Sequence, residues 1–220
     1  MKILIKIWWS LLAPKNTNKI DFDYLEKIST FVKNLPYDVM IVHWTWNVGH
    51  GWVSLLKKNF LGDLKDALKK DYLNGRKKLD DYFCQIDKFF WFKRKTIEDF
   101  LMFPYFEKNT IVSGDVLENW EIISSDDIFQ MVLKNSSVDL WLVLTDVDGV
   151  LDKNCKVIAK ISNLDNVFFW EKENDVTWWM KAKVEKLLWL KTKIIISNGH
   201  NLENVSNWIF KWSWVWTVIG

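Results

Sequence analysis

Three lysines occupy positions from which a protein can bind phosphate. Lys6 lies within the apolar run Ile3–Ile7, which has the character of a buried strand, and Lys15 follows the loop after that strand. Lys183 falls in the first turns of a helix expected over 177–190. Lysine offers phosphate a compact positive charge, and a strand that turns into a helix adds backbone N–H donors. Any one lysine of a lysine-rich chain is more often a surface charge. An unpaired ammonium inside an apolar strand is costly, however, so Lys6 should meet a carboxylate or a bound anion.

Carboxylates that could pair with the strand lysine stand at Asp126 and Asp127, after Ser124, at the head of an expected helix. Capping of that helix explains them equally well, because hydroxyls and carboxylates both stabilise a helix N-terminus. His50 lies in the string Asn47-Val48-Gly49-His50-Gly51. A histidine between glycines can donate a hydrogen bond to a ligand and can change its charge near neutrality, although a lone loop histidine is often incidental.

A third group of polar residues, Thr145-Asp146-Val147-Asp148-Gly149, ends an apolar strand expected over 139–145. Open α/β sheets bind their ligands at the carboxyl ends of such strands. The two aspartates are therefore either a turn signal or a contact for a nucleotide, through its ribose or its magnesium.

Alternating strands and helices must position these residues. The segment 21–35 has apolar residues at helical spacing and ends before Pro36, and the apolar run 38–43 is the next strand. This order predicts an α/β protein, a three-layer αβα sandwich with a mainly parallel central sheet. Further strands are expected over 2–8, 110–115, 193–197 and 215–219, a hairpin over 116–123, and helices over 124–133 and 200–210. Residues 52–107 should form two or three helices with an irregular piece near 89–93.

Composition excludes several classes of protein. The 220 residues carry a net charge of +2, from 30 basic and 28 acidic side chains, so nucleic acid is not an expected partner. No apolar run is long enough to cross a membrane. Lys6 interrupts the apolar start and no small-residue cleavage site follows it, which argues against a signal peptide. Cys84 and Cys155 lack metal-type spacing, which favours reduced thiols in a cytoplasmic protein.

Tryptophan is abundant where glycine is scarce, with 16 Trp against 8 Gly. A globular chain of this length would carry roughly 15 glycines. The tryptophans include Trp8-Trp9, Trp44-Thr45-Trp46, Trp178-Trp179 and Trp212-Ser213-Trp214-Val215-Trp216. A turn that binds phosphate needs glycine for close backbone approach. Either the chain has an aromatic-rich interaction surface, or UGA codons that mean glycine in some bacteria are written here as tryptophan.

Motifs spread along the chain carry a family resemblance. In order they are Ile5-Lys6-Ile7-Trp8-Trp9-Ser10, His43-Trp44-Thr45-Trp46, Val48-Gly49-His50, Ser124-Ser125-Asp126-Asp127, Leu144–Gly149, Asp175–Lys183, Ser197-Asn198-Gly199 and Trp216–Ile219. Together they resemble the amino-acid kinase superfamily, and within it the isopentenyl phosphate kinases. The family pattern has glycine at 8, 9, 44, 46, 178, 179 and 216, all tryptophan here. Independent motifs that all depart from glycine to tryptophan favour the misread-codon hypothesis, which extends to Trp91, Trp120 and Trp212.

The resemblance implies an ATP-dependent kinase in one domain over 1–220, with an acceptor and phosphate lobe over about 1–115 and a nucleotide lobe over about 116–220. Lys6 and Lys15 would bind the transferring phosphoryl group and the substrate phosphate, Asp126 would hold these lysines, and Lys183 would reach the ATP phosphates. His50 would hydrogen-bond the acceptor phosphate. ATP would contact Lys6, Trp8, Trp9, Ser10, Thr145, Asp146, Asp175, Thr177, Trp179, Lys183 and Asn198. The acceptor would contact Trp44, Trp46, Gly49, His50, Gly51 and Ser124.

The resemblance also implies ATP and Mg²⁺ as cofactors without a dedicated protein metal site, a cytoplasmic homodimer, and isopentenyl phosphate as acceptor in isoprenoid biosynthesis. The chain departs from the family at Thr45 and Ser125, where glycine is common, and matches poorly between His50 and Gly114, where the acceptor pocket's wall is expected. One alternative is a related kinase of a phosphonate or another small anion, like the fosfomycin, acetylglutamate or uridylate kinases. If the tryptophans are real, a non-catalytic nucleotide-binding domain is the other alternative.

Overall fold

The computed structural model describes residues 1–13, 19–44, 65–117, 121–152, 154, 156–164, 167, 184–185, 187–188, 194–211 and 217–219. For residues 65–76, 116, 208 and 211 it describes the backbone alone. None of the helices in this part of the chain is long and apolar enough to cross a membrane.

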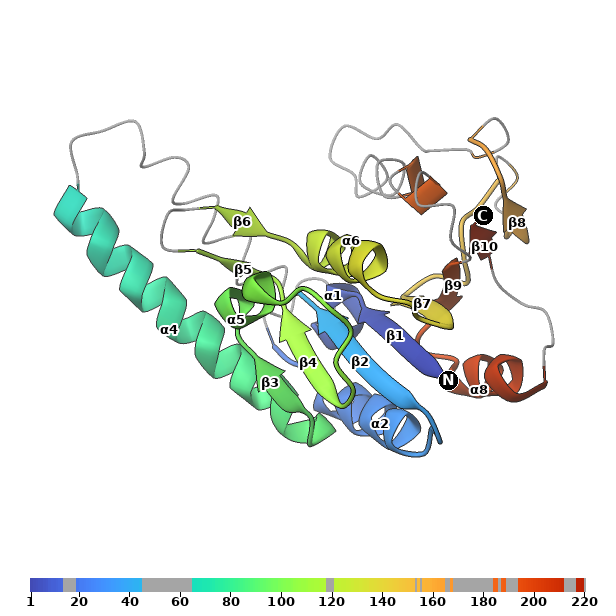
Figure 1. The fold of residues 1–220 in the computed structure, drawn as a ribbon, viewed down its shortest axis with the longest axis horizontal. Coiled ribbons are helices and arrows are strands. Elements are labelled where there is room, and N and C mark those ends of the chain that lie inside the picture. The colour runs from blue at the N-terminus through green and yellow to red at the C-terminus, as the bar shows by residue number, and fades with distance from the viewer. Residues whose placement is uncertain are drawn as a thin grey trace.

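An eight-stranded sheet runs through the middle of the fold, in the order β3-β4-β2-β1-β7-β9-β10-β8 (Figure 1). Its strands are β1 (Lys2–Ile7), β2 (Asp38–His43), β3 (Lys93–Lys95), β4 (Thr110–Ser113), β7 (Leu140–Thr145), β8 (Lys160–Ile161), β9 (Ile194–Asn198) and β10 (Thr217–Ile219). Neighbouring strands pair in parallel, except β9 and β10, which are antiparallel. The prediction of a mainly parallel sheet is confirmed.

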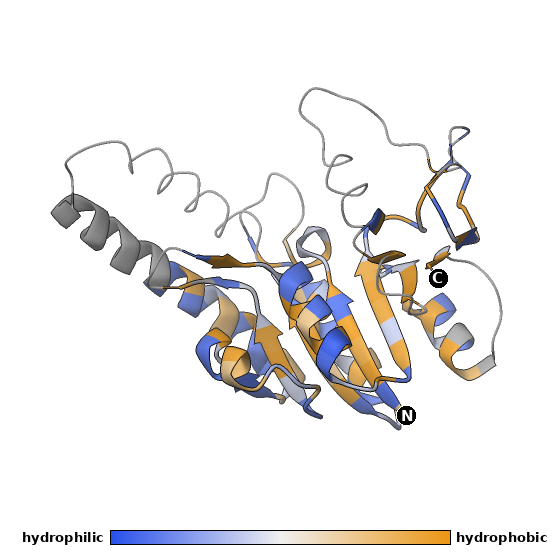
Figure 2. Cartoon of the chain, turned by 45° about the horizontal axis from the view of Figure 1, so that its top comes forward, coloured by the Kyte–Doolittle hydropathy of each residue, from blue (hydrophilic) through white to orange (hydrophobic). Residues whose placement is uncertain are grey.

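Helices cover both faces of this sheet. One face packs against α2 (Phe22–Lys33), α4 (Lys65–Phe90) and α8 (Leu202–Lys211), and the other against α5 (Ile97–Met102) and α6 (Ser125–Asn135). Strand β1 serves both layers, because Ile3 and Ile5 belong to the core with α2 whereas Leu4 belongs to the core with α6. Hydrophobic residues accordingly run along the central strands in Figure 2. The predicted three-layer sandwich is confirmed.

One local prediction needs correction. The expected irregular piece near 89–93 is shorter than predicted: α4 runs to Phe90, two residues follow, and strand β3 begins at Lys93. That strand was missed because Lys93-Arg94-Lys95 has no apolar alternation, which an edge strand does not need. The expected hairpin is present as β5 (Asp115–Val116) and β6 (Ile122–Ile123). The expected helix 177–190 is described only at 184–185 and 187–188, where the chain is helical.

Helix α4 ends at a residue whose backbone conformation suits glycine. Trp91, the first residue after the helix, has φ 51° and is 74% exposed. The other non-glycine residue with positive φ in the described ranges is Asn109, a type that tolerates this conformation. Glycine is the usual residue one position beyond a helix end, because it has no Cβ to clash. The indole of Trp91 lies over the ammonium of Lys33, 4.1 Å from the ring centroid.

Replacing Trp91 should separate the cost of its left-handed backbone conformation from the contribution of its contact with Lys33. Trp91→Ala and Trp91→Gly both lose the contact with Lys33, but only glycine relieves the left-handed backbone. We expect Trp91→Gly to have a free energy of unfolding about 1 kcal/mol higher than Trp91→Ala. Urea denaturation of the two variants side by side measures the difference, and an alanine variant as stable as the glycine variant would contradict a glycine site at 91.

Candidate active site

The carboxyl ends of parallel strands meet along one edge of the sheet. Strands β1, β2, β4, β7 and β9 are mutually parallel, so the residues that end them lie at the same edge (Figure 1). The described residues predicted for the site that follow these strands are Trp8, Trp9, Ser10, Trp44, Thr145, Asp146 and Asn198. The topology therefore brings both halves of the predicted site together, at the edge where open α/β sheets bind ligands.

Lys6 has the carboxylate partner that its burial requires. Its side chain is 4% exposed, lies on the α6 side of β1, and forms an ion pair with Asp126 in the first turn of α6. The residue pattern alone left Asp126 and Asp127 as candidates, and the family resemblance selected Asp126. Asp127 instead completes a capping box, in which Ser124 accepts from the Asp127 N–H and the Asp127 carboxylate accepts from the Ser124 N–H. Asp126 therefore pairs with Lys6, and Asp127 caps α6.

This ion pair is partly accessible to solvent on its Asp126 side. The Asp126 side chain is 25% exposed, whereas the lysine is enclosed. A lysine ammonium that is paired with one carboxylate has N–H donors to spare, because it carries three. Such a lysine can accept a phosphate oxygen as a further partner without moving far.

The indole of Trp8 lies beside this ammonium. Trp8 follows β1, its backbone N–H donates to the carbonyl of Leu144 at 3.0 Å, and its side chain is 7% exposed. Lys6 Nζ is 6.0 Å from the centroid of its ring. Trp8 is also the N-cap residue of the short helix α1 (Trp9–Leu12), yet its side chain makes no capping hydrogen bond. The indole of Trp8 therefore occupies space next to the Lys6 ammonium.

Ser10, in α1, has a hydroxyl that is buried and makes no hydrogen bond within the described residues. A buried hydroxyl without a partner is costly, at about 1–3 kcal/mol. The prediction assigned Ser10 to the nucleotide phosphates. A phosphate oxygen would supply the missing partner.

Trp44 fills the corresponding place after β2. It is 5% exposed, and its ring lies so close to Gly114 that a Cβ built on that glycine would come within 2.1 Å of Trp44 Cε3. Gly114 is held there because its N–H donates to the carbonyl of His43 at 3.0 Å. A smaller residue at 44 would leave open space between the ends of β2 and β4.

Polar residues after β7 and β9 form a second group. Thr145 and Asn198 are register partners, and the Thr145 hydroxyl donates to Asp146 Oδ1 at 3.2 Å. The Asn198 amide donates to Asp148 Oδ1 at 2.9 Å. Asp148 was absent from the predicted site residues, although it stands in the same Thr145–Gly149 string. These oxygens and amides can bind a nucleotide's hydroxyls through hydrogen bonds.

Several predicted site residues lie outside the described part of the chain. These are Lys15, Trp46, Gly49, His50, Gly51, Asp175, Thr177, Trp179 and Lys183. Their roles stay predictions. His43, by contrast, is a buried residue at the strand-end edge that was not among the predicted site residues.

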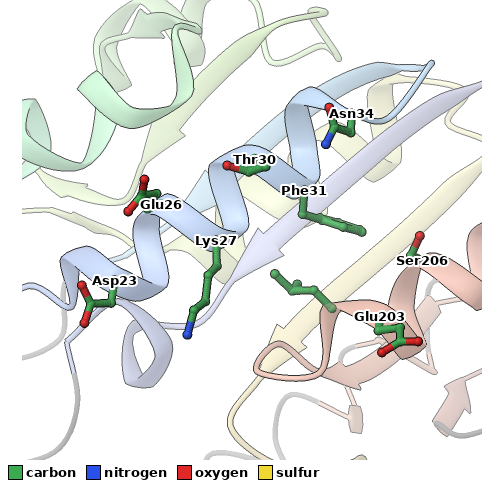
Figure 3. A pocket seen from close by; sticks show the side chains of 9 residues that line it. Asp23, Glu26, Lys27, Thr30, Phe31, Asn34, Glu203 and Ser206 are labelled. Atoms are coloured by element: carbon green, nitrogen blue, oxygen red, sulfur yellow. The ribbon is translucent and has the colours of Figure 1, made fainter.

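A groove between α2 and α8 lies on the other face of the sheet from Lys6 (Figure 3). It is lined by Asp23, Glu26, Lys27, Thr30, Phe31, Asn34, Leu202, Glu203 and Ser206. None of these residues belongs to the predicted site. Its carboxylates outnumber its single lysine, which does not suit a phosphate ligand.

Comparison with known proteins first identifies the fold. Solved structures that the chain resembles over their whole length include an isopentenyl phosphate kinase, with TM-score 0.72, 20% identity and 100% of both chains covered. The UMP kinase of Bacillus anthracis follows with TM-score 0.63 and 15% identity, covering 100% of this chain and 95% of that one. The chain has the amino-acid kinase fold.

The sequence comparison narrows the similarity. The chain is 28% identical to the isopentenyl phosphate kinase of Methanocaldococcus jannaschii, in an alignment that covers 93% of this chain and 94% of that protein. No family model matches the chain. The predicted resemblance to the amino-acid kinases, and to isopentenyl phosphate kinase among them, is confirmed.

Proposed function

We propose that the chain is a kinase that transfers the γ-phosphoryl group of ATP to a small phosphomonoester, with isopentenyl phosphate as the acceptor and isopentenyl diphosphate as the product. The observation that carries the proposal is the buried ion pair of Lys6 and Asp126 at the carboxyl end of a central strand. Similarity to an isopentenyl phosphate kinase over 93% of the chain supports the choice of acceptor.

Phosphoryl transfer requires the protein mainly to position the two substrates and to neutralise their negative charge. Phosphoryl transfer spreads negative charge over oxygens of the transferring group, and fixed cations and N–H donors stabilise it. A phosphate acceptor is already ionised and needs no general base. Lys6 would bind the transferring group, oriented by Asp126, while Ser10 and the N–H groups after β1 would bind the ATP phosphates. Lys15, Lys183 and His50 would complete the set from residues outside the described ranges.

Magnesium would enter with the nucleotide. Among the described residues, no group of three or more His, Cys, Asp or Glu side chains is placed to hold a metal ion. Mg²⁺ commonly keeps several waters and binds through substrate phosphates with one or two carboxylates. Asp146 and Asp148, after β7, are carboxylates of the nucleotide half that could contact the hydrated ion. Mg²⁺ would neutralise charge on the ATP phosphates.

We also infer that the working enzyme has glycine at positions 8, 9, 44, 46, 178 and 179. At 8 and 44 the observed indoles fill the space beside Lys6 and against Gly114. Phosphate oxygens can reach backbone N–H groups only where side chains leave room. A protein that kept these tryptophans would be a non-catalytic nucleotide-binding domain.

The experiment uses the variant with glycine at these six positions, called the glycine variant below. Incubated with ATP, Mg²⁺ and isopentenyl phosphate, it should form ADP and isopentenyl diphosphate, seen as two coupled phosphorus resonances by ³¹P NMR. Phosphonates, acetylglutamate and UMP serve as competing acceptors. If the glycine variant turns over one of these compounds faster than isopentenyl phosphate, that compound becomes the assigned substrate.

His50→Ala tests the acceptor assignment within the glycine variant. Loss of one charge-assisted hydrogen bond to the acceptor phosphate should lower kcat/KM for isopentenyl phosphate about 100-fold. Steady-state kinetics with each substrate varied in turn measures this loss. His200→Ala, at the start of the loop before α8, is the matched control and should leave the rate unchanged. Equal turnover by His50→Ala and its parent would remove the basis for a phosphate acceptor.

A further inference from the structure

A chain of polar side chains lies on the α4 face of the sheet, opposite Lys6, and its histidine is buried. It consists of His43 at the end of β2, Asp87 on α4 and Arg94 on β3. His43 Nε2 lies 3.4 Å from Asp87 Oδ1, and Arg94 Nε lies 3.4 Å from Asp87 Oδ2. The His43 side chain is 1% exposed and the Asp87 side chain 10%. Nothing in the proposed phosphoryl transfer uses these residues.

The helix presents one continuous surface to this histidine. Asp80, Phe83 and Asp87 are spaced three and four residues apart, so they share a face of α4. The imidazole packs edge-on against Phe83, with 5.6 Å between ring centroids. Arg94 lies over the same ring, 5.4 Å from its centroid, and its guanidinium also pairs with Asp80 at 3.3 Å.

Stability alone does not explain an imidazole at this position. Neither ring nitrogen of His43 makes a well-formed hydrogen bond to any described residue, although Nε2 lies 3.4 Å from Asp87 Oδ1. Leaving a buried polar group without a hydrogen bond costs about 1–3 kcal/mol. Arg94 already pairs with the Asp87 carboxylate, so that carboxylate does not depend on the histidine for a partner. An apolar ring would pack against Phe83 at lower cost.

The position of His43 in the chain suggests what it does. It is the last residue of β2, directly before the segment 44–51 in which the acceptor contacts are predicted. Helix α4 begins after that segment, at Lys65, and its first half projects beyond the carboxyl ends of the strands (Figure 1). A contact between His43 and Asp87 therefore ties the strand that enters the acceptor segment to the helix that leaves it.

We propose that His43 is a positioning residue, which through Asp87 and Arg94 sets the placement of α4 against the end of β2 and thereby the geometry of the acceptor side. The inference rests on the proposed kinase function. Lys6 lies on the opposite face of the sheet, and Thr145 and Asn198 lie on β7 and β9 rather than beside β2. We therefore expect the main effect on the acceptor.

The test uses His43→Phe, Asp87→Asn and His43→Gln in the glycine variant. Phenylalanine keeps the ring contact with Phe83 but loses the nitrogens, and asparagine keeps the shape of Asp87 but loses its charge. Because small misplacements of a bound reactant are costly, KM for isopentenyl phosphate should rise about tenfold in both variants, while KM for ATP stays within about twofold. Glutamine can place an amide near the position of Nε2, so His43→Gln should recover most of the affinity.

The double variant His43→Phe/Asp87→Asn sharpens the test. Since the two residues act as one unit, its KM for the acceptor should be no higher than that of either single variant. Equal changes in both KM values, or a lower melting temperature with unchanged KM values, would overturn the positioning role and leave only a structural one.

Hydrogen exchange separates this inference from the proposed function. In His43→Phe, peptides from α4 should exchange faster than in the parent, while peptides from β7 should not change. A glycine variant without kinase activity would overturn the proposed function. Unchanged hydrogen exchange in α4 would overturn the tie between β2 and α4, whatever the kinase activity.

Discussion

Replacing Trp8, Trp9, Trp44, Trp46, Trp178 and Trp179 by glycine should raise the rate of ATP-dependent phosphoryl transfer at least about 1,000-fold, since each lost phosphate-binding donor costs about 10²–10³ in rate. The physical reason is space. The Trp8 indole lies 6.0 Å from Lys6 Nζ and the Trp44 ring lies against Gly114, in positions that phosphate oxygens would need to reach the backbone. A coupled assay for ADP, with isopentenyl phosphate present and absent, measures the gain.

Two further tryptophans serve as controls for this result. Trp91→Gly changes an exposed residue after α4 and should leave turnover unchanged. Trp141→Gly removes a core side chain that is 3% exposed and packs edge-on against Phe129. It should cost about 3–5 kcal/mol of stability and bring no gain in rate. A folded glycine variant as inactive as the tryptophan form would contradict the account of the blocked site.

Lys6→Met in the glycine variant should lower kcat about 1,000-fold, because it removes a fixed cation from the transferring phosphoryl group. Methionine has a similar length and suits a strand whose neighbours in register are Val42 and Val143. Asp126 would lose the ion pair with Lys6, but its side chain is 25% exposed and can be hydrated. The fold should therefore survive, and circular dichroism and the melting temperature establish this before kinetics are measured.

Lys2→Met is the matched control, since Lys2 begins the same strand at the edge far from the site. Its turnover should equal that of the parent. Asp126→Asn should give an intermediate loss, because the lysine keeps its charge but is no longer held in place. Lys6→Met with near-parental kcat would show that the buried ion pair has a structural role only.

Much of the fold could be predicted because the decisive patterns are local. Strands β1 and β2 are short apolar runs, and α2 shows helical spacing with Asp21 as its capping residue, which accepts from the Tyr24 N–H. The order of strand, helix and strand then requires a parallel sheet covered on both faces. Strand β3 escaped prediction because its three residues are all charged and its pairing with β4 depends on tertiary contacts.

The site was predictable in part. A lysine in a buried strand predicted a carboxylate partner, and the resemblance selected Asp126; the capping geometry of α6 shows why Asp127 has the other role. The role of His43 could not be derived from the sequence, because Asp87 lies on a helix whose packing against β2 no short motif records. The strained conformation of Trp91 is likewise a property of the folded backbone, although the scarcity of glycine gave a first indication.

The codons of the tryptophans test the central claim, that the phosphate-facing turns of this kinase-like fold are glycine turns. We expect UGA at 8, 9, 44, 46, 91, 178 and 179, and UGG at 141, where the core needs the indole. Peptides of the protein purified from its own cells should then contain glycine at the UGA positions. UGG codons at 8, 9, 178 and 179, with tryptophan in the corresponding native peptides, would contradict the claim.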